Sequence, residues 1–388
     1  KVTKNLFASE NVANYLRGLK TVGIVDKNES DGLTTIADPV GVVCAMVPTT
    51  NPTSTTIFKS LISLKTRNPI IFSFHPAANE SSKQTARIVR DAAIKAGAPK
   101  GCIQFIEEPS LDATNALMKH DGVSIILATG GSAMVKAAYS CGKPALGVGP
   151  GNVPAYVHKD AKLKEAVIDI VLSKSFDNGM ICASEQAAIV DTEHYEEFIE
   201  LMKEHHVYFV NKEEKAKLEE FVFGAKAYSH NCAGAKLNAD VVGKPATWIA
   251  EQAGFKVPAE TKILAAECAE VGENEPLTRE KLSPILAVIK SISTEDGIEK
   301  SRQMVEFNGL GHSAAVHTQD EEVVEQFGKV IPACRILWNT PTSQGAIGSI
   351  YNALIPSLTL GCGSYGRNSV SGNVGAVNLL NYKIIARR

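Results

Sequence analysis

The stretch "SFDNGMICASEQ" (175–186) contains a cysteine, Cys182, whose surroundings suit reactive chemistry. No other cysteine and no histidine lies within ten residues of it, so the spacing excludes a CxxC redox pair and a zinc cluster at this point. Gly179 before it and Ala183-Ser184 after it are small, which leaves space for a carbon electrophile to approach the sulfur. A lone cysteine is more often a small core residue than a nucleophile, and the local sequence leaves both interpretations open.

Two further stretches place small or polar residues between an expected strand and an expected helix. In "VPTTNPTST" (47–55), Asn51 could present its amide to a developing negative charge at the carboxyl end of a strand, although Asn-Pro and Thr are also ordinary turn and cap residues. In "ILATGGSAMVKAA" (126–138), Gly130-Gly131 would let a phosphate approach the backbone N–H groups at a helix N-terminus. The alternative for the two glycines is a simple tight turn.

Three other positions complete the candidates. The stretch "ALGVGPGNVP" (145–154) holds three glycines and two prolines, a composition that resists regular structure and is typical of a site lining or a domain crossing. Glu280 precedes an apolar strand in "EPLTREKLSPILAVI", where a solvated surface charge is the alternative. His312, in "NGLGHSAAVH", is flanked by glycines and followed by an apolar strand, so we consider it a possible site residue.

Apolar runs and amphipathic stretches alternate along most of the chain. The apolar runs predict buried strands over 41–47, 69–74, 102–106, 123–128 and, after the rhythm restarts near residue 155, 186–190. Helices are expected between these strands, and a helix over 193–205 and a charged helix over 212–221 follow the last one. Strand alternating with helix at this spacing predicts an α/β fold with parallel sheets covered on both faces.

Two segments fall outside this alternation. Residues 27–38, "KNESDGLTTIAD", are polar with an Asp-Gly turn between possible strands, which predicts a hairpin arm. The C-terminal stretch "NSVSGNVGAVNLLNYKII" is rich in glycine and asparagine and has alternating apolar positions, which indicates extended structure.

Composition excludes several classes of protein. The net charge of −2 over 388 residues gives no electrostatic reason to expect nucleic acid or an anionic membrane as partner, and no apolar run approaches a membrane span. The eight cysteines are scattered without metal-ligand spacing, so we predict no metal site and a reducing, cytoplasmic location. The chain begins with Lys and not with Met, and we expect a piece of a larger polypeptide or a processed one.

Four stretches together resemble a known family: "KSLISLKTRN", "LATGGSAMVKAAYS", "SFDNGMICASEQ" and "PSLTLGCGS". They are similar to the aldehyde dehydrogenase superfamily, in its CoA-acylating branch, and most of all to the aldehyde dehydrogenase half of bifunctional aldehyde–alcohol dehydrogenases. The resemblance runs in order from residue 1 to the end. It implies a Rossmann-type NAD-binding domain over 1–155 with the hairpin arm, a catalytic α/β domain over 156–365, and a C-terminal oligomerisation or linker segment over 366–388. It also implies a homo-oligomer, filamentous in the longer parent.

The resemblance further implies a site and a reaction. Cys182 would be the nucleophile, the side chain of Asn51 and the Cys182 backbone N–H would hold the oxyanion, and His312 would handle the proton of the CoA thiol. The enzyme would interconvert acetyl-CoA and NADH with acetaldehyde, CoA and NAD⁺ through a Cys182 thioester, as in alcohol fermentation. Glu280 would accept the ribose hydroxyls on the nicotinamide side, and His75 stands where the family usually has a lysine near the adenosine ribose. The implied NAD(H) contacts are Met46, Val47, Pro48, Thr49, Thr50, Asn51, Gly131, Gly149, Glu280 and Leu360.

One departure from the water-using members of the superfamily favours the acylating branch. Those members carry a glutamate that activates water, in a Glu-Leu-Gly-Gly-Lys stretch, and Val148 stands at the corresponding place, 34 residues before Cys182. Water is poorly activated without such a base, whereas a thiol with a pKa of about 8.5 is already partly thiolate. Two alternatives remain: a hydrolytic NAD(P)-dependent aldehyde dehydrogenase, against which Val148 argues, and a mainly structural filament module, against which Cys182 and the nucleotide-binding stretches argue.

Overall fold

The computed structural model describes residues 1–388, apart from the side chain of Ser132. Its internal contacts divide the chain into two compact units, each described by itself below. The N-terminal unit comprises residues 1–149, 347–349 and 353–388, and the central unit comprises residues 150–346 and 350–352. This division differs from the sequence-based one in the C-terminal part, because residues 353–388 pack with the N-terminal unit. The functions expected of the two units stay predictions.

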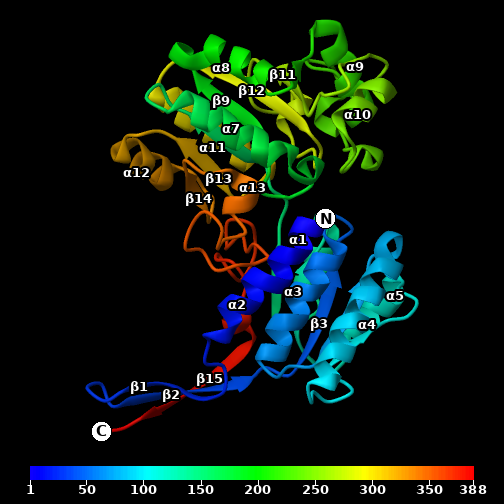
Figure 1. The fold of residues 1–388 in the computed structure, drawn as a ribbon, viewed down its shortest axis with the longest axis vertical. Helices are drawn as coiled ribbons and strands as arrows, with labels where there is room; N and C mark the ends of the chain where they lie inside the picture. Colours follow the sequence, from blue (N-terminus) through cyan, green and yellow to red (C-terminus); the bar gives the residue numbers. More distant parts are fainter. The chain divides into compact units, whose positions relative to one another are not determined.

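The N-terminal unit is built on a five-stranded parallel sheet (Figure 1). The alternation of strands and helices predicted four of its strands. The fifth, Ala145–Val148, lies in the stretch 145–154, which we expected to resist regular structure; that expectation was wrong there, because "ALGV" is itself a short, fully buried run. The strand order of the sheet is β5-β4-β3-β6-β7, which in chain order within the sheet reads 3-2-1-4-5, the order of a dinucleotide-binding doubly wound sheet. The strands are β3 (Val42–Val47), β4 (Ile70–Phe74), β5 (Ile103–Phe105), β6 (Val123–Thr129) and β7 (Ala145–Val148). The helices are α1 (Val2–Leu6), α2 (Val12–Arg17), α3 (Pro52–Lys65), α4 (Asn79–Lys95), α5 (Leu111–Lys119) and α6 (Ser132–Tyr139).

Both faces of this sheet are buried, because successive residues of a strand point to opposite sides. On one face, Val43 and Val47 of β3 share a core with Phe58 of α3. On the other face, Met46 of β3 shares a core with Met118 of α5. Helices on both sides therefore fix the carboxyl ends of β3 and β6, the point at which the strand order reverses and ligands bind in such sheets.

The predicted arm is present as an antiparallel hairpin. Strands β1 (Gly23–Asn28) and β2 (Leu33–Pro39) pair with each other, and β15 (Leu380–Ala386) from the C-terminal end pairs with β2 (Figure 1). The sheet leaves apolar side chains in solvent: Ile24 is 58%, Ile384 64% and Ile385 56% exposed.

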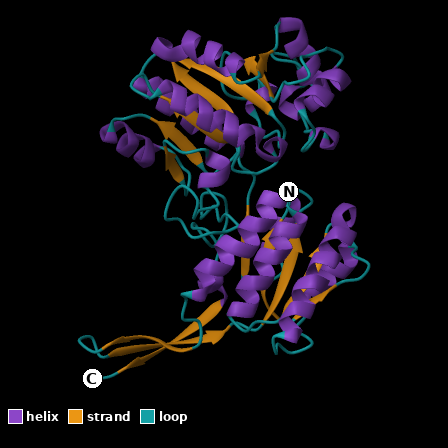
Figure 2. Cartoon of the chain, in the orientation of Figure 1, coloured by secondary structure: helices purple, strands orange, loops and turns teal.

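The central unit contains a seven-stranded parallel sheet in the order β10-β11-β12-β9-β8-β13-β14 (Figure 2). Its strands are β8 (Val153–Val157), β9 (Glu185–Asp191), β10 (Val207–Phe209), β11 (Ile263–Glu267), β12 (Ile285–Ser291), β13 (Ala314–His317) and β14 (Ile336–Trp338). Its helices are α7 (Leu163–Ser175), α8 (Thr192–Glu204), α9 (Lys212–Phe223), α10 (Ala246–Ala253), α11 (Thr294–Asn308), α12 (Glu321–Val330) and α13 (Thr342–Gly345). The central strand β9 is buried along its whole length and begins three residues after Cys182.

Short helical turns complete the two units. They are η1 (Phe7–Asn11), η2 (Pro76–Ala78), η3 (Phe176–Gly179), η4 (Cys232–Gly234), η5 (Ala239–Val241), η6 (Pro276–Thr278) and η7 (Ala376–Leu379). None of the helices formed by the described residues combines the length and the apolar character that crossing a bilayer requires.

Candidate active site

Cys182 lies in a sharp loop between η3 and the amino end of β9. Asp177, Asn178 and Gly179 adopt left-handed backbone angles, with φ of 49°, 52° and 68°, and such angles are most accessible to Gly, Asn and Asp. A side chain on Gly179 would come within 2.5 Å of the carbonyl oxygen of Ser283, so only glycine fits there. The loop leaves Cys182 half-buried.

His312 lies directly against Cys182, although 130 residues separate them in the sequence. Its Nε2 is 3.1 Å from Cys182 Sγ, and its ring is fully buried between the end of α11 and the start of β13. A nucleophile with a base at this distance is the arrangement that nucleophilic catalysis requires. The structure thus brings together Cys182 and His312, the nucleophile and the proton-transfer residue that the resemblance implies.

Gly151 connects this pair to Glu280. A side chain on Gly151 would place its Cβ 2.0 Å from the carbonyl oxygen of Cys182 and 3.2 Å from His312 Cγ. The N–H group of Gly151 donates a 3.0 Å hydrogen bond to Glu280 Oε1. The sequence reading selected Gly149 from the same glycine-rich stretch and missed Gly151, because glycine count alone does not show which glycine touches the loop.

Glu280 is half-buried, and its environment is poorly suited to a charge. Burial raises the pKa of its carboxyl group to about 7, against the opposing effects of the Gly151 N–H and of the charges on Lys174 and Lys281. The carboxyl group therefore changes its charge near neutral pH. A carboxylate here could accept hydrogen bonds from the hydroxyls of a ribose, the role that the resemblance implies for Glu280.

A group of buried polar residues lies behind the cysteine loop. Lys174, Glu185 and Lys281 are fully buried. Gln186 Oε1 accepts hydrogen bonds from Lys174 Nζ (3.4 Å) and from the backbone N–H of Lys281 (3.1 Å). Burial lowers the pKa of Lys174 to about 7 and raises that of Glu185. These contacts fix the first residues of β9. The sequence indicated small residues at Ala183-Ser184 and a strand from residue 186, but it gave no sign of the buried polar group.

In the N-terminal unit, Asn51 is the N-cap residue of α3, shortly after the carboxyl end of β3, and its side chain makes no capping hydrogen bond. The side-chain oxygen of Asn51 accepts a hydrogen bond from Lys4 Nζ, and Lys4 is only 2% exposed. The oxygen is engaged by a lysine, which can only donate. The NH₂ group of Asn51 donates a long hydrogen bond to Thr50 Oγ1 (3.4 Å), and its second N–H can serve a ligand. Lys4 was missed in the sequence, where it is one of two lysines in a polar N-terminal stretch.

The reversal point of the five-stranded sheet is held by another buried lysine. Lys59 Nζ donates hydrogen bonds to the carbonyl oxygens of Met46 in β3 (2.7 Å) and Leu127 in β6 (2.9 Å). Burial lowers the pKa of Lys59 to about 7. The candidate cofactor residues Met46, Val47, Pro48, Thr49 and Thr50 therefore follow a strand end that is anchored to its neighbour.

A cavity of about 300 Å³ opens beside this strand end. Met46, Phe74, Pro76 and Met134 give it apolar walls, and His75 lies at it with Nδ1 accepting a 3.2 Å hydrogen bond from the Ala77 N–H. Such a slot fits a planar heteroaromatic ring. The adenine end of NAD(H) or CoA is therefore compatible with the residues present.

The remaining sequence candidates also lie in the N-terminal unit. Gly131 precedes α6, and a Cβ on it would meet no described atom within 4 Å, so its surroundings are open. A Cβ on Gly149 would be 3.8 Å from Cys362 Sγ. Leu360 and Val148 are buried, Val148 at the end of β7.

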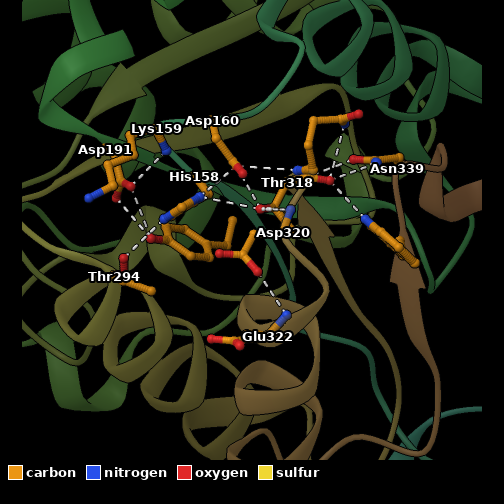
Figure 3. A network of polar contacts seen from close by, with 12 residues as sticks. His158, Lys159, Asp160, Asp191, Thr294, Thr318, Asp320, Glu322 and Asn339 are labelled. Carbon is orange, nitrogen blue, oxygen red and sulfur yellow. Dashed lines mark hydrogen bonds and ion pairs between the residues drawn. The ribbon is translucent and has the colours of Figure 1, made fainter.

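A second polar cluster in the central unit has a different character. Figure 3 shows His158 between Asp160 and Thr294, with Nδ1 2.6 Å from Asp160 Oδ1 and Nε2 3.0 Å from Thr294 Oγ1. Asp160 also accepts a hydrogen bond from Thr318 Oγ1 at 2.6 Å. His158 and Thr318 follow the carboxyl ends of β8 and β13, whereas Cys182 precedes the amino end of β9. Because these strands are parallel, the cluster and Cys182 lie at opposite edges of the sheet. We therefore interpret the cluster as a structural tie between strand ends.

Comparisons with known proteins agree with this architecture. The model of the aldehyde dehydrogenase family matches residues 4–350. An aldehyde-alcohol dehydrogenase of Streptococcus pneumoniae is 70% identical over 388 residues, which is 100% of this chain and 44% of that protein. The bifunctional aldehyde-alcohol dehydrogenase of Escherichia coli is 49% identical over 100% of this chain and 43% of its own length. The chain thus spans less than half the length of these relatives.

Shorter relatives are matched over most of their length. The succinate-semialdehyde dehydrogenase (acetylating) of Clostridium kluyveri is 36% identical over 98% of this chain and 82% of that protein. The crystal structure of an acetylating aldehyde dehydrogenase from Geobacillus thermoglucosidasius matches with a TM-score of 0.95 and 47% identity, over 100% of this chain and 83% of that one. With a parallel α/β fold, a loop cysteine beside a buried histidine and these matches, the chain belongs to the aldehyde dehydrogenase family.

Proposed function

We propose that the chain is a CoA-acylating acetaldehyde dehydrogenase, which interconverts acetyl-CoA and NADH with acetaldehyde, CoA and NAD⁺. The observation that carries the proposal is the 3.1 Å contact between Cys182 Sγ and His312 Nε2. Relatives whose names include "acetylating" support the choice of reaction, since two of them match nearly the whole chain. We also propose that it forms part of a longer bifunctional enzyme of alcohol fermentation, because relatives named aldehyde-alcohol dehydrogenase match all of this chain with less than half of their own length.

Cys182 acts as the nucleophile in both directions of the proposed reaction. Its thiolate attacks the carbonyl carbon of acetyl-CoA, the bond from that carbon to the CoA sulfur breaks, and the CoA thiolate takes up a proton as it leaves. The acetyl group remains on Cys182 as a thioester. When bound, NAD(H) supplies or accepts the hydride that interconverts this thioester with the aldehyde adduct of Cys182. The adduct releases acetaldehyde when its carbon–sulfur bond breaks and the thiolate re-forms.

His312 is proposed to exchange a proton with the thiols that enter and leave. Its Nε2 faces the sulfur of Cys182, and during acyl transfer the CoA sulfur must arrive at the acyl carbon that is bonded to that sulfur. A thiol that attacks the acyl group has to lose its proton, and a positioned base accelerates such steps by about 10²–10⁴-fold.

Asn51 is proposed to donate its amide to the oxyanion of the tetrahedral adduct, together with the Cys182 N–H. The contact from Lys4 supports this role, because it occupies the amide oxygen and leaves the NH₂ group as donor. In other acyl-transfer enzymes, loss of one such donor costs about 10²–10³-fold in rate.

Several residues are proposed to hold NAD(H). Glu280 takes the nicotinamide-side ribose, and its half-buried carboxyl group with a pKa of about 7 supports a role in which charge decides binding. The reversal point of the sheet between β3 and β6 supports placement of the dinucleotide there. The proposed contacts are Met46, Val47, Pro48, Thr49, Thr50, Asn51, Gly131, Gly149, Glu280 and Leu360.

We propose further that the chain is a cytoplasmic homo-oligomer. The exposed isoleucines of the β1-β2-β15 arm support self-association, because a thin three-stranded sheet cannot bury its own apolar side chains. If the longer bifunctional protein forms a filament, we propose that exposed apolar side chains such as these also join its subunits. All eight cysteines are free, which supports a reducing compartment.

The proposed function is tested by following NADH oxidation after addition of acetyl-CoA. The wild type should consume NADH, the Cys182→Ala variant should not, and Cys141→Ala should behave as wild type, since Cys141 is a similarly half-buried cysteine on the other unit. Iodoacetamide should label Cys182 first among the eight cysteines, with activity lost in step. Inactivation that tracks another cysteine while Cys182 stays unlabelled would refute the assignment.

A further inference from the structure

A buried arginine stands next to His312. Arg335, just before β14, is 3% exposed, and its Nη2 donates a 2.7 Å hydrogen bond to the backbone carbonyl oxygen of His312. Its Nε donates a 3.2 Å hydrogen bond to Ser313 Oγ, which in turn lies 3.1 Å from His312 Nδ1. The guanidinium therefore reaches the histidine from the Nδ1 side, while Nε2 faces Cys182.

The sign of this charge is the opposite of that found in most catalytic histidine pairs. There, a carboxylate at Nδ1 stabilises the imidazolium that forms during the reaction. Here the Nδ1 side is held by the Ser313 hydroxyl and the permanent positive charge of Arg335. Burial, together with the charge of Arg335, holds the pKa of His312 well below its usual value.

Two titratable or charged groups contact His312 or its hydrogen-bond partner directly, and two more lie one residue away. Cys182 contacts Nε2, and Arg335 faces the Nδ1 side with Cys334 as its chain neighbour. Glu280 reaches the ring only through Gly151, to whose N–H it is hydrogen-bonded. Arg335 is thus the permanent charge in direct hydrogen-bonded contact with the His312 residue.

We propose that Arg335 is a positioning residue that keeps His312 a neutral ring beside Cys182, so that the pair is a thiol and an imidazole and not a thiolate–imidazolium pair. The proposal deepens the proposed function, on which it rests for the role of His312 in thiol proton transfer. A neutral ring can take the proton of an entering CoA thiol, whereas an imidazolium has no site left to accept one.

The test is the pH dependence of Cys182 alkylation by iodoacetamide, in the absence of acetyl-CoA and NADH. Only the thiolate reacts, so the wild-type rate should fall about tenfold per pH unit below the inflection of the thiol, down to about pH 5. In Arg335→Gln, which removes the charge but keeps an amide donor, burial still lowers the pKa of His312 but the opposing charge is gone, so the ring protonates more readily. An imidazolium favours the neighbouring thiolate, so this variant should alkylate on the order of tenfold faster than wild type near pH 5, relative to each protein's own rate near pH 9.

Matched variants separate charge from packing. Arg335→Lys keeps the charge and should retain the wild-type profile, and the double variant Arg335→Gln/His312→Gln should lose the acid reactivity. A merely structural role for Arg335 predicts slower alkylation at every pH and no gain in acid. Superimposable profiles of wild type and Arg335→Gln would overturn the proposal.

A second measurement needs no Arg335 variant, so it tests the proposal even if the Arg335 variants misfold. If wild-type protein shows a plateau of alkylation in acid that disappears in His312→Gln, the pair is already a thiolate–imidazolium pair and the proposal is wrong. Because no acyl group, CoA or NADH takes part, these outcomes are independent of the acetyl-CoA assay that tests the proposed function.

Discussion

Replacing Gly151 with alanine adds one methyl group at the point where Cys182 and His312 meet. The new Cβ would lie 2.0 Å from the Cys182 carbonyl oxygen, 3.0 Å from the Cys182 carbonyl carbon and 3.2 Å from His312 Cγ. Two of these atoms belong to the backbone, so no side-chain rotation relieves the overlap. A contact of about 3 Å needs the loop or Gly151 to move by roughly 1 Å, and a misplacement of that size costs about 10²-fold in rate.

The assay for this variant is the kcat of acetyl-CoA-dependent NADH oxidation, with thermal unfolding as a check of the fold. We expect kcat to fall by about 10²-fold. Gly328→Ala is the matched control, because Gly328 lies in α12 of the same unit and its Cβ would meet no described atom within 4 Å. That control should keep wild-type activity and gain about 0.5–1 kcal/mol of stability from the loss of a helical glycine. A folded Gly151→Ala protein with wild-type kcat would refute the placement of Gly151 against the cysteine loop.

Three further predictions concern charge and cofactor. Because burial raises the pKa of Glu280 to about 7, its ionised fraction in the ligand-free protein should rise from ~10% to ~90% between about pH 6 and about pH 8. The affinity for NADH, measured by fluorescence titration, should rise up to about tenfold over that range. The Glu280→Gln variant should bind NADH weakly and without this pH dependence. Burial opposes ionisation of Asp160, but the hydrogen bonds from Thr318, His158 and Gln319 outweigh it and lower its pKa. The stability it contributes should therefore be present above the unfolded-state pKa and lost as pH falls through the lower folded-state value, so that urea midpoints of Asp160→Asn depend less on acid than those of wild type. Gly131→Val, finally, should raise the NADH dissociation constant at least about tenfold, or about 1.4 kcal/mol; unchanged affinity in a folded variant would exclude the proposed cofactor position.

The sequence predicted the framework well because the framework rests on local patterns. Apolar runs of strand length alternate with amphipathic stretches, and four strands of the five-stranded sheet follow from that alternation. The strand Ala145–Val148 was missed, because the glycines and prolines of its stretch indicated irregular structure. The hairpin arm could be predicted equally well, since an Asp-Gly turn separates its strands. The partner of the C-terminal strand could not be predicted, because Leu380–Ala386 pairs with β2, more than 300 residues away in the chain.

The candidate site was only partly visible for the same reason. Cys182 and His312 drew attention through small flanking residues, but their contact spans 130 residues and no local pattern contains it. Arg335 and Lys4 are buried cations whose roles come from what they touch, and isolated basic residues in a sequence read as surface charges. Val148 is informative because a glutamate is absent there, and only the resemblance to a family shows that a glutamate would be expected.

The most direct test of the account is the fate of the acyl group when wild-type protein oxidises acetaldehyde with NAD⁺. When CoA is present, we expect acetyl-CoA to form in step with NADH. When CoA is withheld, we expect almost no acetate, because Val148 stands where water-using enzymes carry their base. Rapid formation of acetate and NADH without CoA would contradict the acylating assignment.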